Sequence, residues 1–493
     1  MRIPRVMSTQ HPDNVSMPFF AEHPDMSGED EIQEAYYAFS HLGCDEQMWD
    51  SEGKEVDDFV VKKLYSKYPN FFKKHLLGKD CFITLRIPNP TVEKDEAKIL
   101  VEALESIPRS MDAARIFLKD HPPPIFEVIL PMTTSAKELN RVYYYYKNFI
   151  AGLQHQPIYP GDITVAEWVG DFLPESINVI PLFENIESFF NIDQILEEYV
   201  QNKNLPYLRV FLARSDPALN YGLISAVLGV KVALKKLENF ALKHDIEVYP
   251  ILGVGTPVFR GNFSPYTVEK VLSEYSSVET FTVQSAFKYD FPVEDVIAGV
   301  KKVKTFIRHP ISDVDFEFCQ GIIQKVSEEY KATIAPIAPA INELAKFVPR
   351  RRMRKLHIGL FGYSRSLHGI VLPRVISFCA ACYSIGLPPE IFGLNALTKE
   401  ELHELKNYYH NLEFDFSKSL QYFNPKCLDL MPEEVKNKLI KTLNLLNTLN
   451  LNYEPNEEHK EVTSTLLKNL KKGLSSQATS LIVEAGYLRK FLG

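Results

Sequence analysis

Cysteine is scarce in this sequence, and long hydrophobic runs are missing. Six cysteines among 493 residues are typical of reduced intracellular thiols and too few for a disulfide framework. The most apolar run, Val375–Leu387, is too short to cross a bilayer, and the N-terminal residues lack the apolar stretch of a signal peptide. We therefore expect a cytoplasmic protein that does not bind a membrane. Within this run Cys379 and Cys382 form a CxxC pair, for which buried packing is favoured over redox chemistry.

The chain also lacks a strong excess of charge of either sign. Its 55 Lys and Arg residues face 63 Asp and Glu residues, which gives a net charge of −8 at pH 7. A mildly acidic chain is a poor candidate for binding nucleic acid, although a few converging arginines can still bind a small anion. Hydrophobic residues at 45% and charged residues at 24% exclude a disordered or fibrous chain.

Nucleotide-binding signatures and internal repeats are missing as well. The stretch Gly253–Gly255 lacks the lysine of a phosphate-binding loop and the third glycine of a dinucleotide fingerprint. No segment recurs at a fixed period, which argues against a solenoid or a propeller. The length corresponds to about three average domains or to one elaborated α/β barrel of more than ~400 residues.

What the sequence does contain is an alternation of short apolar runs with helical stretches. Apolar residues at spacings of three and four predict helices over Ala218–His244 and Thr91–Ile107, with Thr91 as the N-cap of the second. Most of the short runs are apolar almost throughout, as in parallel strands that are covered on both faces. Eight strands are predicted: Ile3–Ser8, Cys81–Ile87, Ile125–Pro131, Asn178–Phe183, Leu208–Ala213, Glu247–Leu252, Thr280–Ser285 and Leu356–Gly362.

Eight strands that alternate with helices predict an α/β fold, a (β/α)8 TIM-type barrel. Long stretches separate the first two strands and the last two, so we expect helical insertions there. Beyond residue 395 only helical patterns remain. We therefore expect residues 1–395 to form the elaborated catalytic barrel and residues 396–493 to form a C-terminal helical extension packed on it.

Polar residues follow nearly every predicted strand. In barrels of this type the active site lies at the C-terminal ends of the strands, so these residues are expected to converge. They are His11, Arg86, Thr133, Glu184, Arg214, Asp216, Arg260, Gln284, Lys288 and Arg365.

The chemistry of these residues is of three types. Glu184 and Asp216 end neighbouring strands, where two carboxylates can hold Mg²⁺ or Mn²⁺, or can be solvated or paired with arginine. The arginines can bind phosphate or carboxylate groups. His11 can transfer a proton or stabilise a developing anion, or it can be structural. Together they suit an anionic phosphorylated substrate that reacts through an enolate.

The densest basic run, Arg350–Lys355, allows three interpretations. It can be a nucleic-acid patch, a solvated surface, or a source of arginines at the barrel mouth. The acidic total of the chain argues against the first of these.

Short motifs occur in a fixed order between residue 1 and about residue 390. They read VMSTQHPDNVSMPFF, FITLRIPNP, ILPMTTSAKEL, VIPLFENIESF, RSDPALNYG, GTPVFRGNFSP, TVQSAFKYDFP and GLFGYSRSLHGIVLPR. In content and order they resemble the archaeal-type, short-form phosphoenolpyruvate carboxylases.

The resemblance implies a biotin-independent, Mg²⁺- or Mn²⁺-dependent carboxylation of phosphoenolpyruvate with bicarbonate, which yields oxaloacetate and phosphate. It implies carboxyphosphate and the enolate of pyruvate as intermediates, a carboxy-lyase activity in anaplerotic carbon fixation, and a homotetramer. It also assigns roles to matching residues. His11 handles the carboxyphosphate proton, Glu184 and Asp216 hold the metal ion, and Arg86 and Arg260 act on the substrate.

The sequence departs from the longer members of that family in three respects. The histidine and the first arginine of their glycine-rich loop have no counterpart in Leu252–Gly255. Their motif lysine corresponds to Leu219 here, so its role is empty or is supplied from elsewhere, for example by Arg214. The last two family arginines correspond to Arg351 and Arg365 by spacing, but Arg374 is a further candidate. We expect Arg365 first among these.

Two other functions remain open from the sequence. One is another metal-dependent phosphoenolpyruvate or pyruvate barrel enzyme, such as a phosphotransferase or a C–C lyase. The other is a non-catalytic barrel that binds phosphoenolpyruvate as a sensor. The retention of His11, Glu184 and Asp216 together argues against the sensor.

Overall fold

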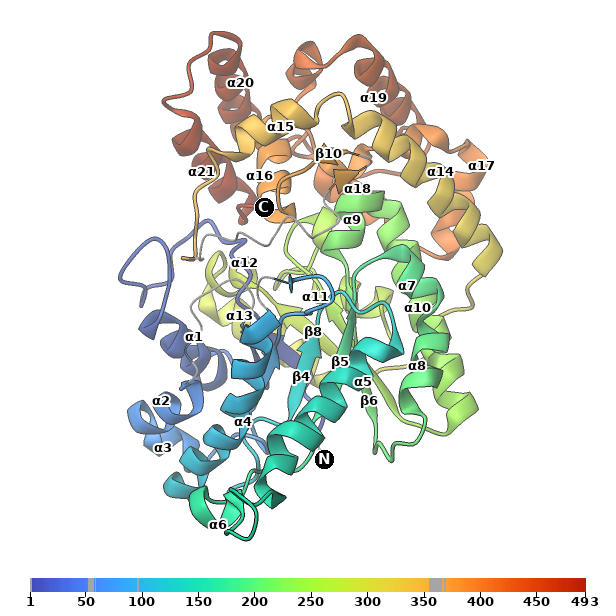
Figure 1. Ribbon diagram of the computed structural model, residues 1–493. Coiled ribbons are helices and arrows are strands. Elements are labelled where there is room, and N and C mark those ends of the chain that lie inside the picture. The colour runs from blue at the N-terminus through green and yellow to red at the C-terminus, as the bar shows by residue number, and fades with distance from the viewer. Residues whose placement is uncertain (1, 52–56, 58, 95–96, 354–365, 368) are drawn as a thin grey trace.

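Eight parallel strands close into a barrel in the computed structural model, which describes residues 2–51, 57, 59–94, 97–353, 366–367 and 369–493 (Figure 1). β1 pairs with both β2 and β8, which closes the ring. The (β/α)8 barrel predicted from the sequence is therefore confirmed. The strands are β1 (Val6–Ser8), β2 (Glu46–Asp50), β3 (Phe82–Arg86), β4 (Glu127–Leu130), β5 (Asn178–Phe183), β6 (Leu208–Ala213), β7 (Val248–Gly253) and β8 (Thr280–Val283).

One barrel strand, β2, was not predicted from the sequence. The sequence EQMWD of β2 is charged at both ends, so it lacks the apolar run expected of a buried parallel strand, yet all five residues are buried. The predicted eighth strand, Leu356–Gly362, lies outside the described residues. Its predicted place in the barrel is wrong, because β8 pairs directly with β1 and leaves no gap in the ring.

The carboxylate of Glu46 in β2 is paired with an arginine inside the barrel. Glu46, Glu127, Arg209 and Thr280 come from the four even-numbered strands and form one layer near their N-terminal ends, as expected for this fold. Arg209 donates to Glu46 at 2.8 and 2.7 Å and to Glu127 at 2.7 Å. Apolar side chains fill the rest of the interior: Met7, Met48, Ile129, Ile180, Leu182, Phe211, Ala213 and Ile251. Because the interior is a packed core, functional groups are left to the strand ends.

Helices cover the outside of the barrel. They are α1 (Glu29–Ser40), α2 (Val60–Lys67), α3 (Pro69–Phe72), α4 (Ala97–Phe117), α5 (Ala136–Tyr145), α6 (Val165–Val169), α7 (Ile186–Phe190), α8 (Ile192–Val200), α9 (Ser215–Tyr221), α10 (Leu223–His244), α11 (Val268–Glu274), α12 (Ser285–Tyr289) and α13 (Val293–Thr305).

Two predicted helices have different bounds in the structure. The helix predicted over Ala218–His244 is divided into α9 and α10 at Gly222, whose φ of 86° is incompatible with a continuing helix. Thr91 and Val92 lie in a turn and not at the start of α4, so the prediction of Thr91 as its N-cap is wrong. The amide of Thr91 instead donates to the side-chain oxygen of Asn89 at 3.1 Å, which makes a local turn before the helix.

A second group of helices lies over one end of the barrel (Figure 1). These are α14 (Phe316–Ile334), α15 (Ala338–Ala345), α16 (Val375–Ser384), α17 (Lys399–Glu404), α18 (Leu412–Leu420), α19 (Glu433–Leu446), α20 (Glu457–Lys471) and α21 (Ala478–Arg489). The side-chain Nδ2 of Asn262, in the loop after β7, donates to Asp415 Oδ1 of α18 at 2.7 Å. This contact identifies the covered end as the one that carries the loops after the strands. The division of the chain at residue 395 stays a prediction.

The apolar run around α16 is a core element. All six cysteines of the chain are free and buried, and burial raises the pKa of the Cys379 and Cys382 thiols. These properties support packing over redox chemistry. Among the described residues no single helix is long and apolar enough to span a bilayer, although the bent pair Val375–Ser384 and Pro389–Ala396 passes on length and composition alone.

Candidate functional site

The loop after β1 is anchored to the residues that follow β8. The amide of Thr9 donates to Val283 O at 3.0 Å, and the amide of Ser285 donates to His11 O at 3.2 Å. Within the loop, Thr9 Oγ1 lies 2.9 Å from His11 Nδ1. His11 is partly exposed at the C-terminal end of the strands. The contact with Thr9 fixes the orientation of its imidazole ring.

A buried ion cluster supports the same loop from below. Lys288 Nζ donates to Ser8 Oγ at 3.0 Å, to Thr9 O at 2.9 Å and to Glu34 Oε1 at 2.9 Å. Arg352 also donates to both carboxylate oxygens of Glu34, at 2.6 and 2.7 Å. Burial opposes the ionisation of Glu34, but the two cations outweigh it and hold the pKa of Glu34 at about 2. Lys288 therefore fixes the backbone of the His11 loop, and Arg352 of the basic run is a buried ion-pair partner.

The far side of this loop is held from two directions. Arg351 donates to Asn14 O at 3.3 Å and to Val15 O at 2.9 Å. The carboxylate of Asp290 accepts the amides of Val15 and Ser16 at 2.8 and 2.7 Å. Burial raises the pKa of Asp290 to about 7 in spite of these hydrogen bonds.

Arg86 ends β3 beside a carboxylate that the sequence analysis missed. Its Nη1 lies 3.3 and 3.4 Å from the two carboxylate oxygens of Asp50, which ends β2 directly opposite in the strand register. Asp50 was missed because β2 was missed, and the signal that would have found it is the polar residue at a strand end. Arg86 is partly exposed, whereas Asp50 is buried.

Glu184 and Asp216 follow two strands that pair with each other. β5 and β6 are in register at Phe183 and Leu212, and both carboxylates come shortly after and are partly exposed. Glu184 Oε2 accepts the amide of Met132 at 2.7 Å, and Asp216 lies in the first turn of α9. Among the described residues there is no group of three or more His, Cys, Asp and Glu side chains that could hold a metal ion. The metal role of the two carboxylates stays a prediction.

Arg260 is buried and joins three loops of the barrel mouth. It donates to Asp13 Oδ2 at 3.1 Å in the loop after β1 and to Ser215 Oγ at 3.2 Å after β6. It also donates to Gln284 Oε1 at 2.5 Å after β8, and to the backbone oxygen of Gly493 at 2.9 Å. The guanidinium is therefore directed at the protein in this structure.

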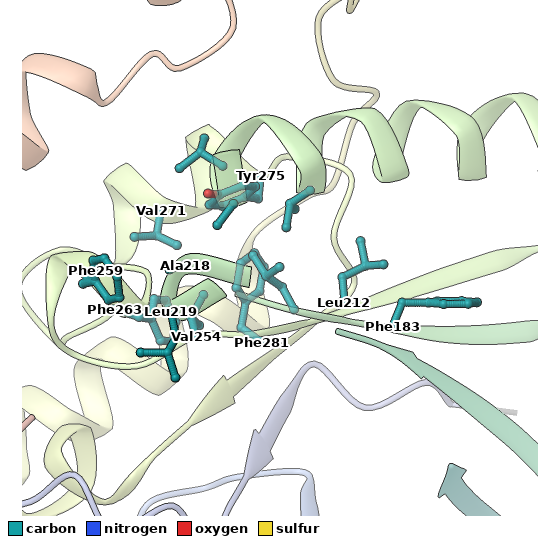
Figure 2. Close-up of a cluster of buried hydrophobic side chains, with 14 of the residues drawn as sticks. Phe183, Leu212, Ala218, Leu219, Val254, Phe259, Phe263, Val271, Tyr275 and Phe281 are labelled. Carbon is teal, nitrogen blue, oxygen red and sulfur yellow. The ribbon is translucent and has the colours of Figure 1, made fainter. Parts of the chain in front are cut away.

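The position of the family lysine is occupied by the apolar core. Leu219 is fully buried and belongs to the cluster of Figure 2, together with Ala218 and Val254. The neighbouring candidate, Arg214, is also buried, and its Nε donates to Tyr275 Oη at 3.3 Å. Its Nη1 has no hydrogen-bond partner among the described residues. The substrate role of Arg214 stays a prediction.

The structure describes two of the three remaining arginine candidates. Arg351 contacts the His11 loop, as described above. Arg374 directly precedes α16 and is partly exposed. Arg365 lies outside the described residues, so the choice among the three stays a prediction.

The comparison with known proteins extends over the whole site. The family described as phosphoenolpyruvate carboxylase matches residues 3–493. The phosphoenolpyruvate carboxylase of Methanospirillum hungatei is 47% identical over 493 residues, and that of Methanothermobacter thermautotrophicus is 49% identical over 493 residues. Both alignments cover 100% of each chain.

A third relative has higher identity over a shorter span. The phosphoenolpyruvate carboxylase of Pyrococcus furiosus is 54% identical over 429 residues, which cover 87% of this chain and 90% of the relative. The motifs, the closed barrel and these matches agree, and the chain belongs to the archaeal-type phosphoenolpyruvate carboxylase family.

Proposed function

We propose that this protein catalyses the biotin-independent carboxylation of phosphoenolpyruvate with bicarbonate to oxaloacetate and phosphate, a carboxy-lyase reaction. The observation that carries the proposal is the family match over residues 3–493, which includes every strand end of the barrel. A bicarbonate oxygen attacks phosphorus, and the enolate of pyruvate leaves as the P–O bond breaks. The resulting carboxyphosphate loses its proton and separates into CO₂ and phosphate. The enolate carbon then attacks CO₂.

His11 is the residue that we assign to proton transfer. Thr9 holds the ring through Nδ1, so we assign the exchange with carboxyphosphate to Nε2. The anchored backbone of the loop supports this role, because a proton acceptor must be held within hydrogen-bond reach of its target.

Glu184 and Asp216 suit a bound Mg²⁺ or Mn²⁺ ion. They provide two partly exposed carboxylates at paired strand ends, and Mg²⁺ is commonly held by one or two carboxylates while waters and substrate phosphate complete its shell. When bound, such an ion would offset negative charge on the phosphoryl group and the enolate. The carboxylate of Glu184 accepts a hydrogen bond from the amide of Met132, which restricts its orientation.

The arginines divide into two roles in this proposal. Arg86 is partly exposed and aligned by Asp50, so we assign it to the anionic substrate, with Arg365 as the second candidate. Arg260 is buried and spans three loops, so we assign it a positioning role. By family resemblance we also expect a cytoplasmic homotetramer.

A coupled assay tests the reaction. Purified protein, phosphoenolpyruvate, Mg²⁺ and bicarbonate are combined with malate dehydrogenase and NADH, and we expect bicarbonate-dependent oxidation of NADH. If phosphate or pyruvate appears without bicarbonate-dependent oxaloacetate, the protein is a different phosphoenolpyruvate enzyme. If phosphoenolpyruvate binds without turnover, the protein is a sensor. Either result refutes the carboxylase.

Variants test the assigned roles. His11→Asn is expected to abolish oxaloacetate formation while phosphoenolpyruvate still binds, and His309→Asn, at an exposed site near the start of β7, serves as the matched control. Glu184→Ala and Asp216→Ala are each expected to weaken Mn²⁺ binding measured by titration calorimetry. The control is Glu187→Ala, an exposed carboxylate three residues from Glu184. Unchanged Mn²⁺ affinity in the two variants would remove the ligand assignment.

A further inference from the structure

Met132, in the turn after β4, has an unfavourable backbone conformation. Its φ is 51°, in the left-handed region that residues with a side chain rarely adopt. Pro131 precedes it in the turn, and a proline ring holds its own φ at about −65°. A proline followed by a residue with positive φ is the pattern of a type II turn, in which glycine or asparagine normally takes the second place. Methionine at this position therefore carries strain, which persists only where surrounding contacts hold the backbone.

The peptide group between Pro131 and Met132 is held at both ends. Its carbonyl oxygen, Pro131 O, accepts a hydrogen bond from Asn89 Nδ2 at 2.9 Å. Its amide, Met132 N, donates to Glu184 Oε2 at 2.7 Å. A trans peptide group is rigid and planar, and its carbonyl and amide point in opposite directions. One rigid group therefore connects Asn89 on one side to the carboxylate of Glu184 on the other.

Asn89 is fixed in place by contacts of its own. It is 1% exposed and follows shortly after Arg86, the last residue of β3. Its Oδ1 accepts the amide of Thr91 at 3.1 Å, and its own amide donates to Glu93 Oε2 at 2.9 Å. Both polar atoms of the Asn89 side chain are therefore hydrogen-bonded, one within its own turn and one to the turn after the neighbouring strand β4. Asn89 thus ties the end of β3 to the strained turn.

The unstrained form of this turn would release Glu184. Rotating the Pro131–Met132 peptide by roughly 180° converts a type II turn into a type I turn, whose negative φ suits methionine. The amide of Met132 would then point away from Glu184, and the carbonyl oxygen of Pro131 would take its side. A carbonyl oxygen cannot donate to a carboxylate, and the two repel each other. The same rotation breaks the hydrogen bond to Asn89, so Asn89 opposes the rotation that the strain favours.

We propose that Asn89 is a positioning residue for the carboxylate of Glu184. It locks the Pro131–Met132 peptide in the strained orientation, and the amide of Met132 then restricts how Glu184 presents its oxygens to a metal ion. Glu184 is a metal ligand in the proposed function, on which this inference rests. Hydrogen bonds that orient a ligating carboxylate raise metal affinity, because they lower the cost of ordering it when the ion binds.

Titration calorimetry with Mn²⁺ on the full chain, without substrate, tests the role of Asn89. Asn89→Ala is expected to weaken Mn²⁺ binding by about twofold to tenfold, the effect of losing one hydrogen bond. Asn89→Ser is a second variant that disturbs the fold less, because its hydroxyl can still accept the amide of Thr91. This hydroxyl is too short to reach Pro131 O, so the same loss of affinity is expected.

Asn411→Ala is the matched control. Asn411 is also buried, and its Nδ2 donates to a backbone oxygen, Lys270 O, at 2.8 Å. It lies at the start of α18, in the second group of helices. Asn411→Ala is expected to lower the thermal unfolding midpoint, as the Asn89 variants do, but to leave Mn²⁺ affinity unchanged. The comparison separates the loss of a buried hydrogen bond from the loss of the link to Glu184.

Two substitutions of Met132 distinguish positioning from a general loss of stability. Met132→Ala and Met132→Gly both remove the packing of the methionine side chain, but only glycine adopts a positive φ without strain. In the Asn89→Ser background, Met132→Gly is expected to bind Mn²⁺ several-fold more tightly than Met132→Ala, because strain no longer favours the rotated peptide. A merely structural role of Asn89 predicts no such rescue, since glycine by itself makes the folded chain less stable.

The outcomes distinguish the role of Asn89 from the ligand role of Glu184. If Glu184→Ala weakens Mn²⁺ binding but neither Asn89 variant does, the positioning role is overturned while the ligand assignment stands. Equal Mn²⁺ affinity in the two Met132 double variants would overturn the positioning role as well. If Glu184→Ala itself leaves Mn²⁺ affinity unchanged, the ligand assignment fails, and the positioning role fails with it.

Discussion

Arg260 offers a decisive test of how the barrel mouth is held together. Replacing it in Arg260→Met keeps much of the side-chain volume but removes the guanidinium that links Asp13, Ser215 and Gln284. Asp13 is then left as a buried carboxyl without its cation. Its burial already raises its pKa, and Arg260 is the main group that opposes this rise.

The size of the effect follows from the burial of the pair. Removing one partner of a buried ion pair costs about 3–5 kcal/mol, because the other charge stays buried without compensation. Unfolding entropy near 2.1 cal/mol/K per residue gives ~1 kcal/mol/K for a chain of this length. The thermal unfolding midpoint of Arg260→Met is therefore expected to fall by about 3–5 °C relative to wild type.

The loss of stability in Arg260→Met also depends on pH, and it is expected to grow as the pH rises. A carboxyl whose folded pKa lies above its unfolded value contributes stability at low pH that is lost as the pH rises through the folded pKa. Without Arg260 the pKa of Asp13 rises further, since burial alone remains. The difference in midpoint between wild type and Arg260→Met is therefore expected to be larger at pH 8 than at pH 5.

Differential scanning fluorimetry and steady-state kinetics measure the two halves of this prediction. Arg350→Met, at an exposed arginine, is the matched control and is expected to leave the midpoint unchanged. Adding Asp13→Asn to Arg260→Met is expected to restore part of the lost stability, because no buried charge remains. A positioning residue lowers kcat more than it raises KM. The reasoning is refuted if the midpoint falls by less than ~1 °C while KM for phosphoenolpyruvate rises strongly, since Arg260 would then bind the substrate.

Three further predictions address other parts of the molecule. Arg209→Met leaves two buried carboxylates uncompensated at the bottom of the barrel, so it is expected to lower the unfolding midpoint by about 3–5 °C with kcat and KM unchanged; altered kinetics would contradict a purely structural layer. Thr9→Val removes the hydrogen bond to Nδ1 of His11, which contributes about 0.5–1.5 kcal/mol. The variant is therefore expected to lower kcat by about twofold to tenfold and to change the pH profile of kcat. An unchanged pH profile would exclude a role for Thr9. Burial raises the pKa of Asp290 to about 7, so the stability that this group contributes at low pH is lost between pH 4 and 7, at up to ~1.4 kcal/mol per pH unit. Asp290→Asn is therefore expected to flatten the pH dependence of the unfolding midpoint over this range. Parallel curves for wild type and Asp290→Asn would contradict the prediction.

The barrel could be predicted from the sequence because most of its strands are apolar almost throughout. β6 is buried at every position and β7 at four of its six positions, so their sequences carry the signal of a covered parallel strand without reference to any other segment. β2 could not be found in this way. Glu46 is tolerated inside the barrel because the hydroxyl of Thr84 and the guanidinium of Arg209 both donate to it, and Arg209 lies 163 residues further along the chain.

The positions of the candidate residues at the strand ends could be predicted from the sequence, but their exposure could not. Counting from the strand ends identified His11, Arg86, Glu184 and Asp216, and the structure brings all four to the C-terminal end of the barrel. The prediction from strand ends gave Arg260 and Arg86 the same role. Their environments differ, because Arg86 is partly exposed whereas Arg260 is enclosed by residues from three loops.

The sequence by itself determined the periodic pattern, the motifs and the types of reactive side chain, because each of these is a local property of neighbouring residues. Tertiary structure alone decided which charges are buried and which surfaces are left open. Arg260 meets Asp13 across 247 residues, and Arg352 meets Glu34 across 318 residues. Contacts between such distant segments depend on how the barrel closes, and so does the burial of these arginines.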